Sequence, residues 1–322
     1  MKVNCTLAVV FLTLSALSVP AAYGKDELIV GVRQDAKPFS YRNINEEVAN
    51  SFDEFSGYVV EICRQTFDDL RKIVPELSLR TVTTTAFQRE QMLETGQIDV
   101  LCDPASIASE RSSWGVPSTP IFLTGIGFAA AEPFPRTAYC GAIVGIVTGT
   151  TSNLRSLQRI LNGNEMVRFK TVLEGAIDGK KEASIKSEEC LRLGTEISPP
   201  AIKRYQTHDV AVKDFCEGKF LYYVGDIDII AAKIKEYGCR ARLSTNTFTE
   251  ERYVIYISTS DSQDSRAALR AKFLSVLQHG ILTSNYIGIA FHREFAGYKP
   301  SQPLQIFVRT ITGVEQGLNK NE

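Results

Sequence analysis

Short apolar runs alternate with amphipathic helical stretches in the first part of the chain, and this alternation limits the possible folds more than any other feature. The run at 27–33 is rich in β-branched residues, which is typical of a strand buried in a parallel sheet. Apolar side chains then recur at helical spacing over 57–73. Further strands are expected at 77–85 and 97–102, with a second helix between them. Strands that alternate with helices predict an α/β fold, in which right-handed crossovers join parallel strands.

The same pattern restarts later in the chain, which indicates a second lobe and agrees with a length of 322 residues. A long strand at 120–131 is expected to leave the first lobe, and the Pro- and Gly-marked segment at 132–141 is a candidate hinge. The charged, Gly-rich segment at 162–200 is interpreted as an irregular insertion. An amphipathic helix is expected from 203 to Gly218, followed by a strand and another helix. A strand at 252–258 is expected to return toward the first lobe, and two C-terminal helices complete the pattern.

Residues 1–24 have the parts of a signal peptide. Lys2 supplies a positive start, an apolar run follows, and Ala22 and Gly24 form a small-x-small cleavage site. The run is short for a membrane span, and no later stretch reaches about 18 apolar residues. We therefore expect a secreted, periplasmic protein whose mature chain begins near residue 25.

Cysteine usage agrees with an oxidising compartment. The chain has seven Cys, and an even number remains once Cys5 is removed with the signal peptide, which favours disulfides. No CxxC pair occurs, which argues against a zinc or thioredoxin-like site. Proximity in the sequence suggests the pairs Cys63–Cys102 and Cys216–Cys239, although each of these Cys also fits a small buried apolar position.

Charge and histidine content exclude some classes of function. The formal net charge of −1 and the pI near 6.4 give no basic footprint for nucleic acid. With three His in all, a His-rich metal site is not expected, and we predict neither a metal nor a cofactor. The Gly-Thr-Thr turn at 149–151 lacks the Lys of a P-loop, so nucleotide binding is not expected there.

The stretch from Asp99 to Arg111 is the first candidate site. It is expected to be a buried strand that ends at Cys102, a polar loop with Ser106, and a short helical turn that carries Arg111. Open α/β sheets bind ligands beyond their strand ends. A guanidinium there can pair with a carboxylate through two hydrogen bonds. The alternative is an ordinary surface Arg on a loop.

Two further positions fit a ligand with both charges. Thr150 and Thr151 are expected at a helix N-terminus, where free N–H groups can hold an anion, and capping alone is the alternative. Asp226 lies where an apolar strand ends. It either caps the helix that follows or holds a ligand ammonium.

Several ordered motifs resemble the family 3 extracellular solute-binding proteins, the amino-acid receptors of ABC importers. The motifs are IVGVRQDAKPFSY, SGYVVEIC, R-x3-L-x2-G-x2-D beginning at Arg89, ASIASER, PIFLTGIGF, VGIVTGTTS and GKFLYYVGD. The resemblance covers nearly the whole mature chain apart from roughly 160–200. It implies a two-lobe periplasmic binding protein fold of type II, in which each lobe is a mainly parallel sheet flanked by helices. A two-strand hinge would join lobe 1 (25–133 and 259–322) to lobe 2 (134–258).

The resemblance also implies roles for individual residues. Arg111, with Ser106 and Thr151, matches the positions that hold the ligand α-carboxylate, and Asp226 matches the residue that takes the α-ammonium. Phe39 and Thr150 lie within the matching motifs and are placed in the same binding set.

The position of the ligand side chain is where this sequence departs from the family. Arg33, Arg89 and His208 align with basic positions that glutamate/aspartate-binding members use for a second carboxylate. The alternative for His208 is a plain surface His. Asp103 and Pro104, however, stand where those members have Gly and Ser, and Asp103 would repel an acidic side chain if it pointed inward. Ala86 lacks a hydroxyl that is expected there. Ala36 stands where basic-amino-acid binders place a stacking aromatic, which argues against lysine or arginine as the ligand.

The expected function is therefore binding without catalysis. A polar or acidic L-amino acid such as glutamate or aspartate would be captured by closure of the lobes, and a monomer would deliver it to the permease of an ABC importer. The alternative is an enzyme on the same scaffold, such as a periplasmic cyclohexadienyl dehydratase, with Asp103 as its candidate general acid. A sensor domain is a third interpretation.

Overall fold

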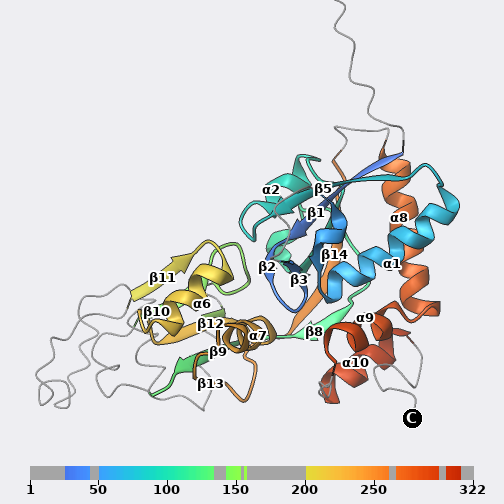
Figure 1. Cartoon of the computed structure of the whole chain (residues 1–322). Coiled ribbons are helices and arrows are strands. Elements are labelled where there is room, and N and C mark those ends of the chain that lie inside the picture. Colours follow the sequence, from blue (N-terminus) through green and yellow to red (C-terminus); the bar gives the residue numbers. More distant parts are fainter. Residues whose placement is uncertain are drawn as a thin grey trace, which may run out of the picture.

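The computed structural model describes residues 26–43, 51–133, 143–153, 156–157, 201–260, 266–296 and 302–312. The elements in these ranges form two groups, each built around its own sheet, and two connecting segments run between them (Figure 1). The expected signal peptide, the insertion at 162–200, Cys140 and Cys190 lie outside the described residues.

The first sheet has the strand order β5-β1-β6-β14-β7, and β8 also pairs with β14. Its strands are β1 (Glu27–Arg33), β5 (Ser78–Thr84), β6 (Val100–Ser106), β7 (Val116–Pro117), β8 (Phe122–Thr124) and β14 (Glu251–Ile257). β1 is parallel to both β5 and β6, whereas β14 is antiparallel to β6. A small sheet of β2 (Asp35–Ala36), β3 (Ser40–Arg42) and β4 (Phe55–Ser56) lies beside it.

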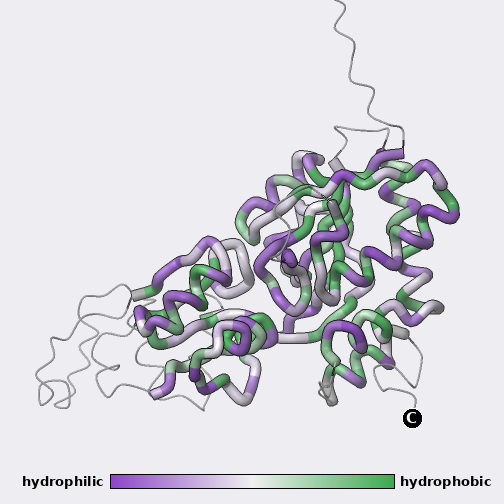
Figure 2. Tube along the Cα trace, viewed as in Figure 1, coloured by the Kyte–Doolittle hydropathy of each residue, from purple (hydrophilic) through white to green (hydrophobic). Residues whose placement is uncertain are grey.

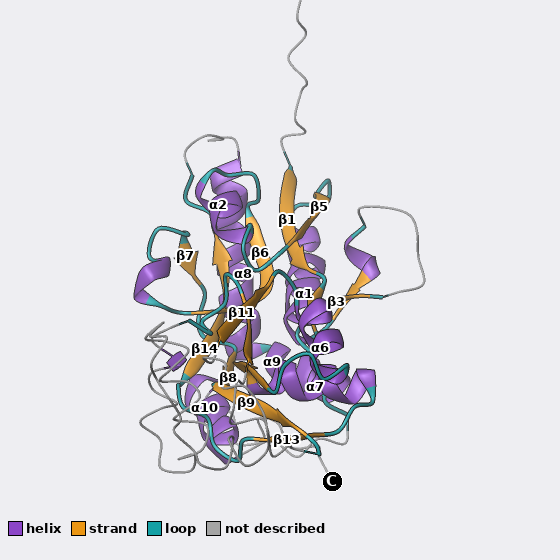
Figure 3. Cartoon of the chain, turned by 90° about the vertical axis from the view of Figure 1, so that its left-hand side faces the viewer, coloured by secondary structure: helices purple, strands orange, loops and turns teal. Residues whose placement is uncertain are grey.

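Alternate side chains of β1 face different helices, as expected for a strand buried on both faces. Leu28, Val30 and Val32 belong to a core shared with α1 (Tyr58–Ile73), α8 (Ala267–Thr283), α9 (Tyr286–Glu294) and α10 (Gln302–Thr312). Ile29 belongs to a second core on the opposite face, together with Leu93 of α2 (Arg89–Glu94). Figures 2 and 3 show the hydrophobic strands and the helices that flank them.

The second sheet has the order β11-β10-β12-β9-β13. Its strands are β9 (Ile126–Ala131), β10 (Ile143–Val147), β11 (Ala201–Tyr205), β12 (Tyr222–Asp226) and β13 (Ala241–Leu243). β10 is parallel to β11 and β12, and β9 is antiparallel to β12. One face of this sheet packs against α6 (His208–Cys216) and α7 (Ile227–Tyr237). The predicted class is confirmed: two sheets with helices against them, each containing parallel pairs and at least one antiparallel strand.

Both suggested disulfides are present. Cys63–Cys102 ties α1 to β6, and Cys216–Cys239 ties the end of α6 to the segment after α7. The strand that carries Asp103 is therefore covalently attached to the helix beneath it.

The single strand expected at 120–131 is in fact two strands that belong to different sheets. β8 pairs with β14 in the first sheet, and β9 pairs with β12 in the second. Gly125 separates them, and a Cβ there would lie 2.1 Å from the carbonyl oxygen of Thr249 on the returning segment. The expected lobe boundaries at 133/134 and 258/259 lie past these crossings. We propose that the lobes divide near Gly125 and Glu250 instead.

Two other expectations are corrected by the register. Strand β6 continues to Ser106, because Ala105 and Ser106 pair with Val254 and Tyr253 of β14. Asp103 therefore lies within a strand and not in a loop. The helix expected from 203 begins only at His208, because the preceding residues extend the second sheet as β11 beside β10. Among the described residues, no helix is both long and apolar enough to cross a membrane.

Candidate functional site

A small cavity lies where the two sheets face each other. Its free volume is about 20 Å³, which accommodates about one water molecule and is far less than an amino acid occupies. A larger ligand can reach it only if the lobes separate. The cavity is lined by Arg33, Arg89, Pro104, Ser106, Arg111, Ile126, Thr150, Thr151, Ser152, His208, Asp226, Ile229 and Tyr253. All residues of the expected binding set except Phe39 are in this lining.

Arg111 is a buried cation at the end of a short 3-10 turn, Ser109–Arg111. Its guanidinium donates to the carbonyl oxygen of Ser106 at 3.0 Å and, across the cavity, to that of Gly149 at 3.5 Å. The ring of Trp114 lies beneath it, 4.6 Å from the guanidinium carbon. Within the described part of the chain, no carboxylate forms an ion pair with it. Burial and then the charge of Arg89 lower the pKa of Arg111 to about 10.

The Gly-Thr-Thr turn of the second lobe closes on this guanidinium. Thr150 Oγ1 donates to the Val147 carbonyl at 2.7 Å and accepts from the Ser152 N–H at 3.2 Å, which fixes the turn after β10. Gly149 has φ +77°, and its carbonyl accepts from both Arg89 (3.2 Å) and Arg111. Gly149 was not in the expected set, although its place in the same Gly-Thr-Thr turn was a usable signal.

Asp226 ends β12 and begins α7. Its Oδ1 accepts from the backbone N–H groups of Asp228 (3.1 Å) and Ile229 (3.4 Å), so the capping alternative is realised in the structure. Its Oδ2 accepts from the hydroxyl of Tyr253, and the same carboxyl borders the cavity. Burial and the neighbouring Asp228 raise the pKa of the Asp226 carboxyl well above its usual range. A ligand ammonium at this point would favour the ionised form.

The two arginines of the expected side-chain pocket are already paired. Arg89 Nη1 lies 2.7 Å from Asp103 Oδ2, and Arg33 Nη1 lies 3.9 Å from Asp103 Oδ1. Arg33 also donates through Nε to Asp35 at 2.7 Å. Burial opposes the charge of Arg33, but Asp35 and Asp103 outweigh it and raise the pKa of its guanidinium.

His208 is buried at the start of α6 and meets the same cluster. Its backbone N–H donates to Asp35 Oδ2 at 2.6 Å, and its Nδ1 lies 2.5 Å from the Tyr223 hydroxyl. Its Nε2 has no hydrogen-bond partner among the described residues. Burial, followed by the charge of Arg33, lowers the pKa of His208 to about 3, so the imidazole is neutral at pH 7.

Phe39 lies outside the lining and is corrected to a supporting core residue. It is fully buried, and its ring packs edge-on against Tyr253 (5.0 Å between centroids) and Phe122 (4.8 Å). It thus holds in place Tyr253, which sequence reasoning missed. The position of Tyr253 on the strand returning to the first lobe was the available signal.

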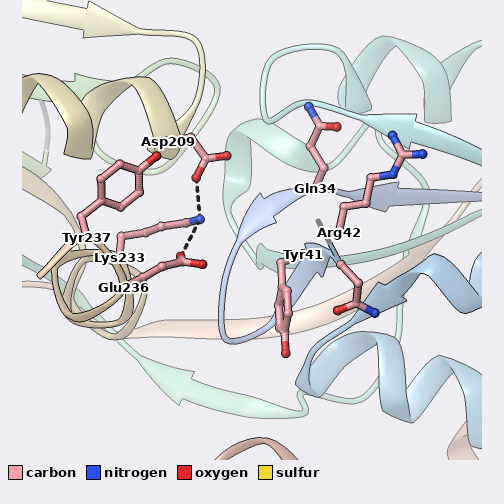
Figure 4. Close-up of a pocket in the computed structure, with 8 residues that line it drawn as sticks. Gln34, Tyr41, Arg42, Asp209, Lys233, Glu236 and Tyr237 are labelled. Carbon is pink, nitrogen blue, oxygen red and sulfur yellow. Dashed lines mark hydrogen bonds and ion pairs between the residues drawn. The ribbon is translucent and has the colours of Figure 1, made fainter. Parts of the chain in front are cut away.

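A second, larger groove of about 600 Å³ lies at the rim between the lobes (Figure 4). Gln34, Tyr41, Arg42 and Asn43 face Asp209, Lys233, Glu236 and Tyr237 across it. The Lys233 ammonium is already bonded to Asp209 at 2.5 Å and Glu236 at 3.1 Å. The groove is therefore a weaker candidate than the cavity with Arg111. In the part of the chain that the structure describes, no group of three or more His, Cys, Asp or Glu is placed to hold a metal ion.

Comparison with known proteins gives a family match. Residues 28–279 match the model of the bacterial extracellular solute-binding proteins, family 3. Two curated relatives are glutamate/aspartate import solute-binding proteins. That of Salmonella typhimurium is 25% identical over 132 residues, which is 39% of this chain and 41% of that protein. That of Escherichia coli is 26% identical over 98 residues, which is 30% of this chain and 31% of that protein. The chain thus matches less than half the length of each.

Solved structures show the same fold at low identity. An ancestral arginine-binding protein bound to glutamine is 17% identical, with a TM-score of 0.57 and coverage of 84% of this chain and 98% of that one. Holo ArgBP from T. maritima is 17% identical, with a TM-score of 0.55 over 84% and 97% of the two chains. An ancestral amino-acid-binding protein described as a precursor of cyclohexadienyl dehydratase is 16% identical, with a TM-score of 0.54 over 84% and 96%.

Proposed function

We propose, on the premise that this chain belongs to the bacterial extracellular solute-binding proteins of family 3, that it binds an amino acid between its two lobes. A polar or acidic L-amino acid is the candidate class, since two glutamate/aspartate import proteins are among the relatives. The protein would act in the periplasm after removal of residues 1–24 and would deliver the ligand to the permease of an ABC importer.

One observation carries this proposal: the cavity contains a buried guanidinium, that of Arg111, with no carboxylate partner among the described residues. A buried cation without a counter-ion is costly, and a ligand carboxylate would supply both the charge and the acceptors. We assign the α-carboxylate to Arg111, Ser106 and Thr151. Asp226 takes the α-ammonium, and the side chain extends toward Arg33, Arg89 and His208.

The mechanism follows from the contacts across the cavity. Arg89 and Arg111 on one lobe donate to Gly149 on the other, and Asp35 accepts from His208. These contacts hold the lobes together around a space smaller than the ligand, so binding requires opening and then closure on the bound molecule. The segments near Gly125 and Glu250 are the only two that join the sheets within the described ranges, and they would act as the hinge.

We expect a screen of the twenty amino acids to identify a ligand. At a concentration of about a hundred times its Kd, the ligand would stabilise the protein by about 2.7 kcal/mol and raise Tm by roughly 5 °C. Differential scanning fluorimetry followed by isothermal titration calorimetry measures both. If none of the twenty amino acids shifts Tm or produces heat, the amino-acid assignment is wrong.

We expect binding to weaken as pH falls from 8 to 5, because a ligand ammonium needs the ionised form of Asp226 and the pKa of this buried carboxyl is raised in the free protein. Binding then releases a proton, and affinity rises with pH until Asp226 is ionised without ligand. Asp226→Asn should bind about tenfold more weakly at pH 8 and show a flatter profile. Titration calorimetry of both proteins across this range is the measurement, and equal pH profiles would contradict the role of Asp226.

An enzyme on this scaffold is the second candidate, and one observation favours keeping it. Asp226 lines the cavity, and its carboxyl has a raised pKa, as a general acid requires. Asp103, the candidate expected from sequence, is ion-paired with Arg89 at 2.7 Å and does not line the cavity. Turnover of prephenate or arogenate by the purified protein, lost in Asp226→Asn, would support this alternative. Absence of turnover together with a bound amino acid would exclude it.

A further inference from the structure

We propose that Asp103 supplies inside the binding site the negative charge that an acidic ligand side chain would otherwise bring, so that the ligand is an amino acid with an uncharged polar side chain, such as a carboxamide. This inference rests on the proposed function and narrows its ligand class. It assigns Asp103 the role of a specificity-determining residue.

The geometry places Asp103 at the end of the site where the ligand side chain would lie. Its side chain is fully buried and contacts Arg89 at 2.7 Å and Arg33 at 3.9 Å. Both arginines line the cavity, whereas Asp103 does not. The disulfide at the adjacent Cys102 fixes this part of β6 to α1. The carboxylate is thus a fixed part of the protein that lies beside both arginines without lining the cavity itself.

The charges of the site balance only if the ligand side chain is neutral. Asp35 and Asp103 compensate Arg33 and Arg89. The α-carboxylate of the ligand compensates Arg111, and its ammonium compensates ionised Asp226. A second carboxylate would therefore be buried without a counter-charge, which is strongly unfavourable.

His208 does not readily supply the missing positive charge. Burial and the adjacent Arg33 keep its imidazole neutral, with a pKa of about 3. An acidic ligand would then need a proton at His208 or on its own side chain. The charged and titratable groups around this region come from several elements: Arg33, Asp35, Arg89, Asp103, Arg111, His208, Tyr223, Asp226, Asp228, Lys233, Glu251 and Tyr253.

The polar atoms that remain unpaired suit an uncharged polar group. Arg33 Nη2, Arg89 Nε and His208 Nε2 are buried without hydrogen-bond partners among the described residues, and Ser152 Oγ is in the same condition on the other lobe. A carboxamide oxygen can accept from the guanidinium donors, and its NH₂ group can donate to a hydroxyl or a neutral imidazole. An apolar side chain would leave all of these atoms unsatisfied.

The first test uses the unmodified protein and the isosteric pair glutamine and glutamate, with asparagine and aspartate as a second pair. We expect the amide of one pair to bind at least about tenfold more tightly than its acid at pH 7. As pH falls from 7 to 5, the affinity of the acid relative to its amide should rise by about tenfold per unit, because the acid enters only with an added proton. The effect of Asp226 cancels in this ratio. A ratio that favours the acid and does not change with pH would overturn the inference.

The second test removes the built-in charge. Asp103→Asn should shift the acid-to-amide affinity ratio toward the acid by at least about tenfold at pH 7, because Arg33 and Arg89 regain an unpaired positive charge. Asp214→Asn is the matched control, since Asp214 pairs with Lys203 and Lys219 on the second lobe and its loss changes the net charge equally. If Asp103→Asn folds poorly, the pH series on the unmodified protein decides.

The outcomes separate this inference from the proposed function. If no amino acid binds, the proposed function fails and this inference fails with it. If the protein binds glutamate or aspartate as the anion, or an apolar amino acid best, amino-acid binding stands and the role of Asp103 is wrong.

Discussion

Replacing Arg111 by Ala is expected to weaken amino-acid binding by at least about thirtyfold while leaving the fold intact. The side chain is buried in the cavity, and a ligand carboxylate would be its ionic partner. Removing one member of a buried, hydrogen-bonded ion pair costs about 2–5 kcal/mol of binding free energy. At about 1.4 kcal/mol per factor of ten, this range corresponds to a loss of about thirtyfold to a few thousandfold in affinity.

The same substitution should change the free energy of unfolding less than most substitutions of buried residues do. In the unliganded protein the Arg111 guanidinium is desolvated and has carbonyl oxygens, not a carboxylate, as its polar partners among the described residues. Its removal therefore eliminates a buried charge that has no counter-ion among the described residues. We expect the free energy of unfolding to change by no more than about 1 kcal/mol. By contrast, removing Arg89 would leave the buried Asp103 with only the more distant Arg33 as its counter-charge, and this should destabilise the fold.

Titration calorimetry with the ligand found in the amino-acid screen measures the loss, and circular dichroism with thermal unfolding verifies the fold. Arg111→Lys should give an intermediate affinity, because the charge stays and the two-pronged geometry is lost. Arg80→Ala is the control, since Arg80 is a half-exposed residue of β5 that pairs only weakly with Glu27, at 3.6 Å. Unchanged affinity in Arg111→Ala would place the ligand elsewhere.

The single Trp of the chain offers a second readout for the unmodified protein. The ring of Trp114 lies close to two guanidinium groups of the site, 4.6 Å from that of Arg111 and 5.3 Å from that of Arg89. A ligand carboxylate would change the electrostatic field at the indole. Tryptophan emission should therefore report binding directly, without a label.

The sequence predicts well those features that are encoded locally. Strand β1 has the bounds expected from its β-branched run, and α1 begins within one residue of its expected start. Asp226 is the last residue of its strand, so a carboxyl at the edge of the sheet could be expected from local pattern alone. Such features depend on the intrinsic preferences of neighbouring residues, and one sequence suffices to read them.

Features that depend on long-range packing were missed or misplaced. Phe39 has the aromatic character expected of a site residue, but its surroundings are set by Phe122 and Tyr253, distant in sequence. The break of the long strand at Gly125 depends on close contact with Thr249. The partners of Asp103 likewise come from β1 and α2. The sequence alone does not determine what Asp103 contacts. The structure shows that its carboxylate pairs with Arg33 and Arg89.

Gly149 is the clearest case of such a long-range constraint, and its substitution should prevent full closure of the lobes. Gly149→Ala would place a Cβ 2.3 Å from the carbonyl oxygen of Ala86 on the other lobe. This contact forces the lobes apart and lengthens the hydrogen bonds from Arg89 and Arg111 to the Gly149 carbonyl. If the ligand-bound state keeps Gly149 this close to Ala86, the affinity for the ligand should fall between about tenfold and a hundredfold, mainly through a faster dissociation rate.

The matched control is Gly218→Ala, which separates closure from backbone strain. Gly218 has φ +75° and Gly149 has φ +77°, so an Ala at either position pays a similar cost of about 1–2 kcal/mol for the left-handed conformation. A Cβ at Gly218 meets nothing within 4 Å. Both variants therefore share the cost of backbone strain, while only Gly149→Ala should lose affinity. Stopped-flow measurement of dissociation by Trp114 emission distinguishes them. Equal dissociation rates in the two variants would mean that the contact between Gly149 and Ala86 does not form in the bound state, and that the ligand is held without the closure described here.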